Sequence, residues 1–165
     1  MQHYLNKVAL KIGILSDSHG WIHPDIISLM NTCDQIVHAG DIIEEQTLSV
    51  LTQPLTAVRG NNDKHIKLKD IETLSLPGGK IVIEHGQEHG WQTPSHKSLR
   101  QTHPNARAII YGHTHKQVID TESSPWIINP GASGAVRNGG SSKCLVLSIN
   151  SSQNWEFTPH IFESI

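Results

Sequence analysis

The sequence predicts a single α/β domain over residues 1–165, with a parallel half followed by a largely antiparallel half. Three observations support this fold class. The length of 165 residues is close to the ~150 residues typical of one domain. In the first half, short apolar runs alternate with amphipathic stretches, as in a parallel sheet with crossover helices. In the second half, apolar runs follow one another with turn residues between them, which is typical of antiparallel strands.

Three strands and two helices are predicted in the first half. The strands are runs rich in valine, isoleucine and leucine that end near polar or glycine-containing turns, namely Val8–Leu15, Gln35–His38 and Leu55–Val58. Pro24 suits the start of a helix, and it opens the predicted helix Asp25–Asn31. A second helix is predicted over Glu44–Leu51. This order of strands and helices predicts right-handed crossovers and a parallel sheet.

The second half begins with a predicted hairpin. Its strands, Glu72–Leu76 and Lys80–Glu84, are joined by the turn Pro77-Gly78-Gly79. A helix is predicted over Pro94–Thr102. The remaining apolar runs are predicted strands: Ala106–Tyr111, Gln117–Asp120, Trp126–Ile128, Cys144–Ile149 and Trp155–Ile161.

Composition excludes several classes of protein. The 13 lysines and arginines against 15 acidic residues give a net charge of −2, so no stable nucleic-acid complex is expected. No run approaches the ~18 apolar residues of a membrane span, and the start of the chain lacks the pattern of a signal peptide. The 2 cysteines cannot form a disulfide framework. These features predict a cytoplasmic protein, and its 12 histidines raise the expectation of a metal site.

Polar side chains collect where the predicted strands end, which is where ligand sites of open α/β sheets lie. Each segment offers a carboxylate, an amide oxygen or an imidazole. The segments are Asp17-Ser18-His19, Gly40-Asp41, Gly60-Asn61-Asn62-Asp63, Glu84-His85-Gly86 and Gly112-His113-Thr114-His115. Taken singly, an aspartate at a strand end is more often a helix cap, and Gly-Asn-Asn-Asp is more often a turn. Their shared position favours a metal site.

The spacing within these segments suits two metal ions. Residues two apart in an extended chain lie on the same side, so Asp17 and His19 can bind one ion from a single loop. His113 and His115 can each reach one of two ions, and the two oxygens of Asp41 can bridge them. Imidazole mixed with oxygen ligands suits Mn, Fe, Zn or Co better than Ca or Mg. We therefore expect two divalent ions, Mn²⁺ first, with Zn²⁺, Fe, Co²⁺ or Ni²⁺ as the alternatives.

As a set, these five segments resemble the signature of the calcineurin-like metallophosphoesterases, and their spacing is similar to the small single-domain phosphodiesterase branch of bacteria and archaea. The resemblance runs from about Lys11 to Gly140 and includes Asn129-Pro130-Gly131. It implies a four-layer α/β/β/α sandwich of mixed sheets. It also implies two ligand sets that share Asp41. The first consists of Asp17, His19, Asp41 and His115, and the second of Asp41, Asn61, His85 and His113.

The resemblance implies a phosphodiesterase in which a hydroxide shared by the two ions attacks phosphorus in line, with Asn61 and Arg59 offsetting charge on the phosphoryl oxygens. Arg59 could equally pair with a carboxylate. The expected partner is a small phosphoester, and a homo-oligomer is left open. Two alternatives are kept: a phosphomonoesterase, including a protein phosphatase, and a non-catalytic interaction scaffold like the retromer subunit that shares this fold.

Two departures from the family pattern concern proton supply. Larger phosphatases carry a histidine where this chain has Asn62, and an amide cannot deliver a proton to the leaving group. The fourth motif reads His85-Gly86-Gln87-Glu88-His89 in place of His-Gly-His. The leaving group therefore takes its proton from His89 or from water. Asp63 is expected to orient a metal ligand, and His38 is expected to be structural.

Overall fold

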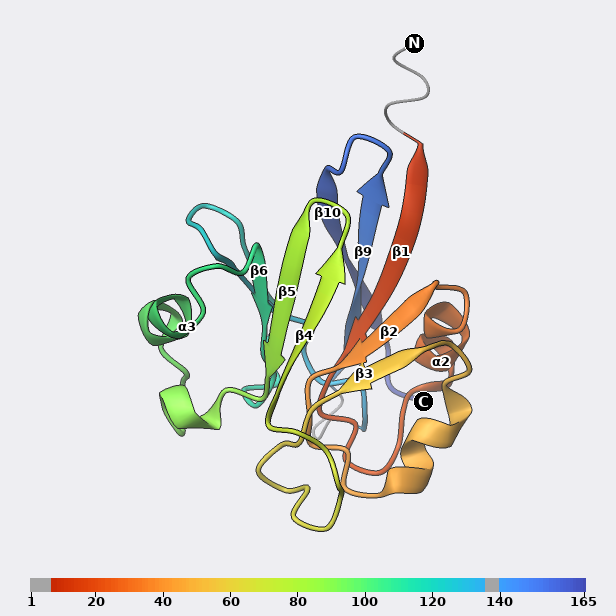
Figure 1. Cartoon of the computed structure of the whole chain (residues 1–165). Helices are drawn as coiled ribbons and strands as arrows, with labels where there is room; N and C mark the ends of the chain where they lie inside the picture. Colours follow the sequence, from red (N-terminus) through yellow and green to blue (C-terminus); the bar gives the residue numbers. More distant parts are fainter. Residues whose placement is uncertain (1–6, 136–139) are drawn as a thin grey trace.

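Two five-stranded sheets pack face to face in the computed structural model (Figure 1). The structure describes residues 7–135 and 140–165. The first six residues of the predicted domain, and residues 136–139 at the end of the predicted family resemblance, lie outside this range.

The first sheet has the strand order β10-β9-β1-β2-β3. Its strands are β1 (Val8–Leu15), β2 (Gln35–His38), β3 (Leu55–Ala57), β9 (Ser142–Asn150) and β10 (Trp155–Phe162). The first three are parallel, as predicted, while β9 is antiparallel to both β1 and β10. Helix α2 (Pro24–Met30) and the 3₁₀ helix η1 (Glu45–Val50) connect the parallel strands.

The second sheet has the strand order β4-β5-β6-β8-β7. Its strands are β4 (Ile71–Leu76), β5 (Gly79–Glu84), β6 (Ala108–Ile110), β7 (Val118–Asp120) and β8 (Trp126–Asn129). Its centre is parallel, because β6 pairs in parallel with both β5 and β8. The one-turn 3₁₀ helix η2 (Gln87–His89) and helix α3 (His96–Thr102) form the connection from β5 to β6.

The prediction of a parallel half and an antiparallel half is wrong in two respects. The second half contains a parallel centre, since the connection through α3 is long enough to return the chain in the same direction. Its last hairpin, β9–β10, joins the first sheet. Local differences are smaller: the helix predicted over Glu44–Leu51 is 3₁₀, and the one predicted from Pro94 begins at His96 after the cap Ser95.

The chain forms four layers of secondary structure, and an apolar cluster lies between each pair of neighbouring layers. Strand residues alternate between faces, so Ile12 and Ile14 of β1 pack between the two sheets, whereas Leu15 packs under α2. A third cluster lies under α3 and contains Leu99 and Ile109. The predicted α/β/β/α sandwich of mixed sheets is therefore confirmed. The described helices are too short and too polar to span a bilayer.

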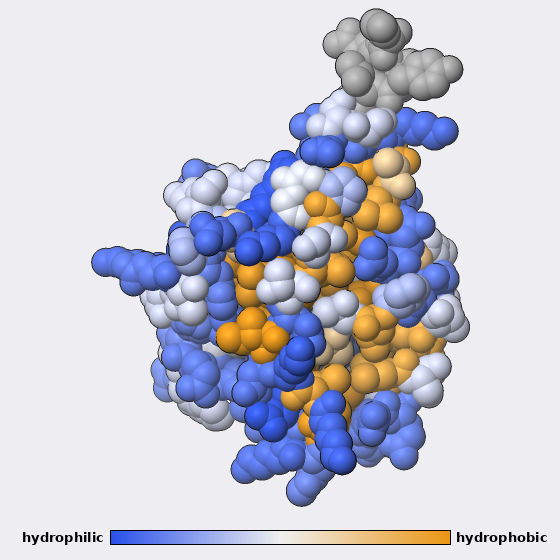
Figure 2. Space-filling model, viewed as in Figure 1, coloured by the Kyte–Doolittle hydropathy of each residue, from blue (hydrophilic) through white to orange (hydrophobic). Residues whose placement is uncertain are grey.

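The central strands are covered on both faces, which explains why β1 reads as a nearly continuous apolar run. Figure 2 shows the face that carries the edge strands β3 and β4, where apolar residues lie among polar ones. The carboxyl ends of β1, β2, β3, β5 and β6 carry the five polar segments.

Candidate metal centre

The loops that follow these five strands are joined to one another by hydrogen bonds. The Asp17 amide donates to the Gly40 carbonyl at 2.9 Å, which links the loops after β1 and β2. The Gly112 amide donates to the His85 carbonyl at 3.1 Å, linking the loops after β5 and β6. The His113 amide donates to Asp17 Oδ2 at 3.1 Å and so connects the two sheets. The polar segments therefore form one site.

The backbone at the predicted ligands is strained. Non-glycine residues rarely adopt positive φ, and it costs on the order of 1–3 kcal/mol when they do. Five predicted metal ligands have positive φ: Asp17 (52°), His19 (49°), Asp41 (58°), His113 (70°) and His115 (62°). Such strain persists where the surrounding structure holds it, and it gathers at functional sites.

Two glycines allow the loops to approach this closely. A Cβ atom on Gly60 would clash with Asp41 Oδ1, and one on Gly112 would clash with the hydroxyl of Ser16 and with Asp17 Oδ2. Glycine is therefore required at both positions for the carboxylates to sit where they do.

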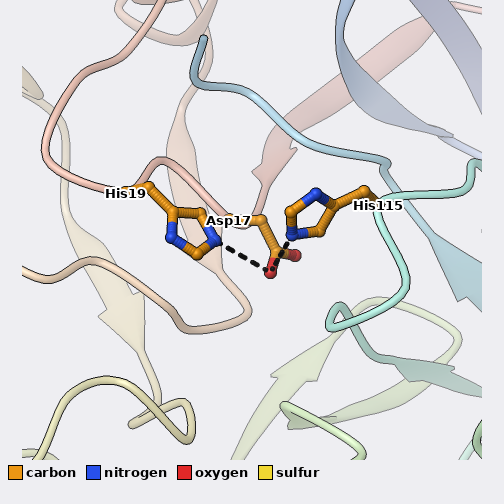
Figure 3. Close-up of side chains that lie close together, drawn as sticks. All are labelled: Asp17, His19 and His115. Atoms are coloured by element: carbon orange, nitrogen blue, oxygen red, sulfur yellow. Dashed lines mark ion pairs between the residues drawn. The ribbon is translucent and has the colours of Figure 1, made fainter. Parts of the chain in front are cut away.

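One group of ligand atoms surrounds Asp17. His115 Nε2 lies 3.3 Å from Asp17 Oδ1, and His19 Nε2 lies 3.8 Å from the same oxygen. Figure 3 shows the two imidazoles on either side of this carboxylate, although they come from loops far apart in the sequence. Their ring centroids are 5.2 Å apart. These are three of the four ligands predicted for the first ion.

A second group surrounds Asp41. His85 Nε2 lies 3.4 Å from Asp41 Oδ2, and His19 Nε2 lies 3.6 Å from it. Asp41 is therefore within reach of one histidine from each predicted ligand set. Asp17 Oδ1 also lies 3.8 Å from His85 Nε2, so both carboxylates stand between the two sets.

Asn61 and His113 complete the second set. The Trp91 carbonyl can only accept a hydrogen bond, so the Nε2 of His113 that contacts it carries a proton. In the neutral ring, Nδ1 then has a lone pair, and it faces Asn61 Oδ1 at 3.1 Å. Two acceptors facing each other need a cation or a second proton between them. The His113 and His85 rings are adjacent, with centroids 5.2 Å apart.

Two buried atoms at the centre of the site have no hydrogen-bond partner in the structure: Asp17 Oδ1 and His85 Nε2. His85 Nδ1 donates to the Ala39 carbonyl at 2.8 Å, so in the neutral ring the lone pair is on Nε2, the atom closest to Asp41. Burying unpaired polar atoms is costly. A divalent cation would satisfy both atoms at once, and imidazole and carboxylate are donors such ions accept. The residues present therefore fit a metal.

The charges at the site also favour a cation. Burial disfavours the charged form of Asp17, but its interactions with His115, His19 and Ser16 outweigh this, so the pKa of Asp17 lies well below its usual range. Burial likewise opposes ionisation of Asp41, and contacts from His85 and Asn62 again lower its pKa. The site therefore holds two ionised carboxylates, and their charge attracts a cation.

Asp63 and Asn62 position the loop after β2, which carries Asp41. The carboxylate of Asp63 accepts from the backbone amides of Ile42 and Ile43 at 2.8 and 2.7 Å, and from that of Gly60 at 2.8 Å. Asp63 thus bonds to backbone amides next to Asp41 and Asn61, and not to an imidazole as expected from the sequence. The side-chain amide of Asn62 donates to Asp41 Oδ2 at 2.8 Å, a role that sequence reasoning missed.

His38 links the first two loops from a fully buried position. Its Nδ1 accepts from the Gly40 amide at 3.1 Å, so Nε2 carries the proton and donates to the Ser18 hydroxyl at 2.9 Å. Burial lowers the pKa of His38 to about 4. The structural role expected for His38 is confirmed by these contacts.

Asn129 has a task that its place in a sequence motif does not reveal. Its side-chain amide donates to the Gly112 carbonyl at 2.9 Å and to the Thr114 hydroxyl at 3.1 Å, so it fixes the loop that carries His113 and His115.

Sequence reasoning also missed Lys64, although it directly follows the segment Gly60-Asn61-Asn62-Asp63. It lines the pockets beside Asn61 and has no ion-pair partner within the described ranges.

Arg59 and His89 both lie beside the site and both have partners. The guanidinium of Arg59 pairs with Asp70, with Nε and Nη2 each 2.9 Å from Oδ1. The alternative of a carboxylate partner is therefore the one observed. His89 Nε2 lies 2.8 Å from Glu84 Oε1, and its Nδ1 contacts the Ser98 hydroxyl at 2.7 Å. His89 would have to give up one of these contacts to act as an acid.

Comparison with known proteins identifies the family. The model of the calcineurin-like phosphoesterase superfamily domain matches residues 10–152. A phosphodiesterase of Methanocaldococcus jannaschii is 28% identical over 144 residues, covering 74% of this chain and 83% of that protein. A probable metallophosphoesterase of Mycoplasma pneumoniae is 30% identical over 142 residues, covering 78% of this chain and 82% of that protein.

Among solved structures, wild-type Vps29 of Entamoeba histolytica in complex with zinc has the same fold. It superposes with a TM-score of 0.72 at 18% identity, covering 93% of this chain and 99% of that one. The family match confirms the predicted resemblance and the predicted enzyme class, a hydrolase of phosphoric esters that depends on divalent metal ions. The chain belongs to the calcineurin-like phosphoesterase superfamily.

Proposed function

We propose that this protein is a phosphodiesterase with two divalent metal ions, Mn²⁺ first among them, in one centre. The observation that carries the proposal is the pair of buried, unpartnered ligand atoms, Asp17 Oδ1 and His85 Nε2, among residues that supply both predicted ligand sets. When bound, two such ions make hydroxide available near neutral pH for in-line attack on phosphorus and offset charge on the phosphoryl oxygens.

The chain's own residues divide the remaining tasks. Asp17, His19 and His115 would hold one ion, Asn61, His85 and His113 the other, and Asp41 both. Lys64 and Arg59 line the pocket next to Asn61, where their positive charge suits a phosphate ester. Of the two, Lys64 is the better candidate to meet the substrate, because the Arg59 guanidinium is already paired with Asp70.

The hydrogen bond between Asn62 and Asp41 favours diesters over monoesters as substrates. Its amide holds Asp41, so the position that larger phosphatases give to a histidine supplies no proton donor. A leaving group must then depart with help from water or from His89.

We further propose a small phosphoester as the substrate, one domain over residues 1–165, a cytoplasmic location, no stable complex with nucleic acid and no membrane attachment. A homo-oligomer stays an open proposal.

A non-catalytic scaffold is the second candidate function. The likeness to Vps29, at 18% identity, concerns the fold and does not separate a scaffold from an enzyme. The strained loops favour the enzyme, because backbone strain of this kind gathers at catalytic sites, and here it falls on five predicted metal ligands.

The test is metal content and turnover of the purified protein after chelation and reloading with Mn²⁺. We expect about two ions per chain and hydrolysis of bis(p-nitrophenyl) phosphate well above that of p-nitrophenyl phosphate. Preferred hydrolysis of the monoester would replace the diesterase by a phosphomonoesterase. Metal binding without turnover of either ester would favour the scaffold.

A further inference from the structure

Two pockets meet at the metal ligand Asn61. The first, of about 690 Å³, extends past Arg59, Ile71 and His89. The second, of about 640 Å³, extends past His65 and Trp91. Both pockets share Asn61, Lys64, Gln87 and Glu88 in their walls. A phosphodiester carries two organic arms on one phosphorus, and a phosphate next to Asn61 could direct one arm into each pocket.

The second pocket has an unusual wall. Trp91 is 65% exposed, although burial of so large an aromatic side chain is normally favourable. Its main chain is nevertheless anchored, because its carbonyl is bonded to the ring of His113. Its own ring meets the His113 ring at 65°, with centroids 5.2 Å apart. The indole is thus held beside a predicted metal ligand, in the wall of the pocket, with most of its surface open to solvent.

The polar residues around Trp91 suit a flat group that also carries hydrogen-bonding edges. Gln87 offers an amide donor and acceptor, Glu88 an acceptor, and Lys64 a donor. A purely apolar ligand would leave these groups without partners. Stacking of a nucleobase on an aromatic side chain is a common and favourable contact, with the base edges left free to hydrogen-bond.

We propose that the pocket lined by Trp91 binds a nucleobase, so that the substrate is a nucleoside phosphodiester. The inference rests on the proposed phosphodiesterase and specifies its substrate class. Trp91 forms the stacking surface, and the neighbouring polar side chains contact the edges of the base. The pocket past Arg59 receives the second arm of the diester. The walls of this pocket are a mixture of charged and apolar side chains, so the second arm need not be aromatic.

The test compares two ligands with the same phosphorylated ring, with and without a base, thymidine 5′-monophosphate and 1,2-dideoxyribose 5-phosphate, by calorimetry on the Mn²⁺-loaded protein. Because one stacked base contributes about 1–3 kcal/mol, we expect the nucleotide to bind at least about 5-fold more tightly. Trp91→Ala should abolish this ratio, and Trp91→Phe should keep most of it. Trp21→Ala is the matched control, since Trp21 is also exposed, at 41%, but does not line either pocket.

A second measurement locates the binding. The nucleotide should inhibit hydrolysis of bis(p-nitrophenyl) phosphate at least about 5-fold more strongly than the sugar phosphate does, and Trp91→Ala should remove the difference. Equal binding of the two ligands, a ratio that survives Trp91→Ala, or binding without inhibition would overturn the inference. If the protein hydrolyses no diester, the proposed function fails, while calorimetry still decides whether Trp91 binds a base.

Discussion

Two clusters of carboxylates and imidazoles lie close together in this protein, yet they differ in how their polar atoms are satisfied. The predicted metal centre contains Asp17, Asp41 and His85, with two buried ligand atoms that lack partners. The second cluster contains Glu84, His89 and His103, whose ligand atoms also lie within 4.8 Å of one another. Within the described residues, no buried side-chain oxygen or nitrogen of this cluster lacks a partner.

The second cluster is explained without a cation. Both oxygens of Glu84 accept from an imidazole, one from His89 at 2.8 Å and the other from His103. The second nitrogen of His89 contacts the Ser98 hydroxyl. The three residues of this second cluster have no positive φ, in contrast to the strained loops of the metal centre. Proximity of ligand-type residues is therefore a weak sign of metal binding, whereas unsatisfied buried atoms on a strained backbone are a strong one.

The largest effect should come from the Asp41 carboxylate of the metal centre, and the same change in the second cluster, Glu84→Gln, is its control. Asp41→Asn removes charge from the point where the two predicted ligand sets meet, so we expect diesterase activity to fall about 1,000-fold, or about 4 kcal/mol in activation free energy. Glu84→Gln should keep about two ions per chain. Metal analysis and steady-state kinetics on both variants check this. Near-native turnover in Asp41→Asn at saturating Mn²⁺ would show that Asp41 does not bridge.

The next effect concerns pH, because the metal centre depends on a neutral His38. Its pKa is about 4 in the folded protein, against the ordinary histidine value of 6.5 in the unfolded chain, so the unfolded chain binds the additional proton between these values. The contribution of His38 to stability is therefore complete above pH 6.5 and falls as the pH drops towards 4. At 1.36 kcal/mol per pKa unit, the total loss is about 3 kcal/mol.

Urea unfolding of the metal-free protein from pH 7.5 to 4.5 measures this loss. His38→Gln is the comparison, since it retains an amide that can bond Ser18 but has no proton to gain. We expect the variant to be less stable at pH 7.5 and to lose less stability on acidification. Parallel curves for the two proteins would mean that the pH dependence arises from other groups.

Metal removal should separate the clusters by thermal stability. A ligand present at 100 times its dissociation constant stabilises a protein by about 2.7 kcal/mol, which raises the Tm of a domain of this size by about 5–10 °C. We expect Mn²⁺ to produce this shift in the chelator-treated protein and in Glu84→Gln, and to produce much less in Asp41→Asn. Ca²⁺, which prefers all-oxygen ligands, should shift the Tm less than Mn²⁺ does.

The sequence predicts the strands well because strands depend on local patterns. The run Val8–Leu15 is β1 with the same bounds, and each predicted ligand follows a strand end. Sheet topology depends on distant segments, so the parallel pairing of β6 with β8 and the return of β9 to the first sheet could not be predicted from local patterns.

The hydrogen bonds that hold the predicted ligands in place could not be predicted from residue spacing. Asn62 and Asn129 act through the direction of an amide group, which no residue spacing reveals. The choice of Asp70 as the partner of Arg59 depends in the same way on how the two side chains face each other. Residue type and position in a motif indicate what a side chain can do, and the packing around it decides which of those roles is used.

The smallest effect should be the stability lost when the second cluster is disturbed. In Glu84→Gln, the new carbonyl oxygen can still accept from one imidazole, but the amide NH₂ meets the N–H of the other. We expect a cost of about 1–2 kcal/mol in the free energy of unfolding of the metal-free protein, because one buried donor loses its acceptor. In a His103→Ala background the same change should cost less, since the donor in conflict is gone, with a coupling energy of about 1 kcal/mol. Urea unfolding of the four proteins measures the cycle. If Zn²⁺ instead stabilises the Asp41→Asn protein strongly, and Glu84→Gln in that background abolishes the effect, the second cluster binds metal and its satisfied hydrogen bonds are no guide to metal binding.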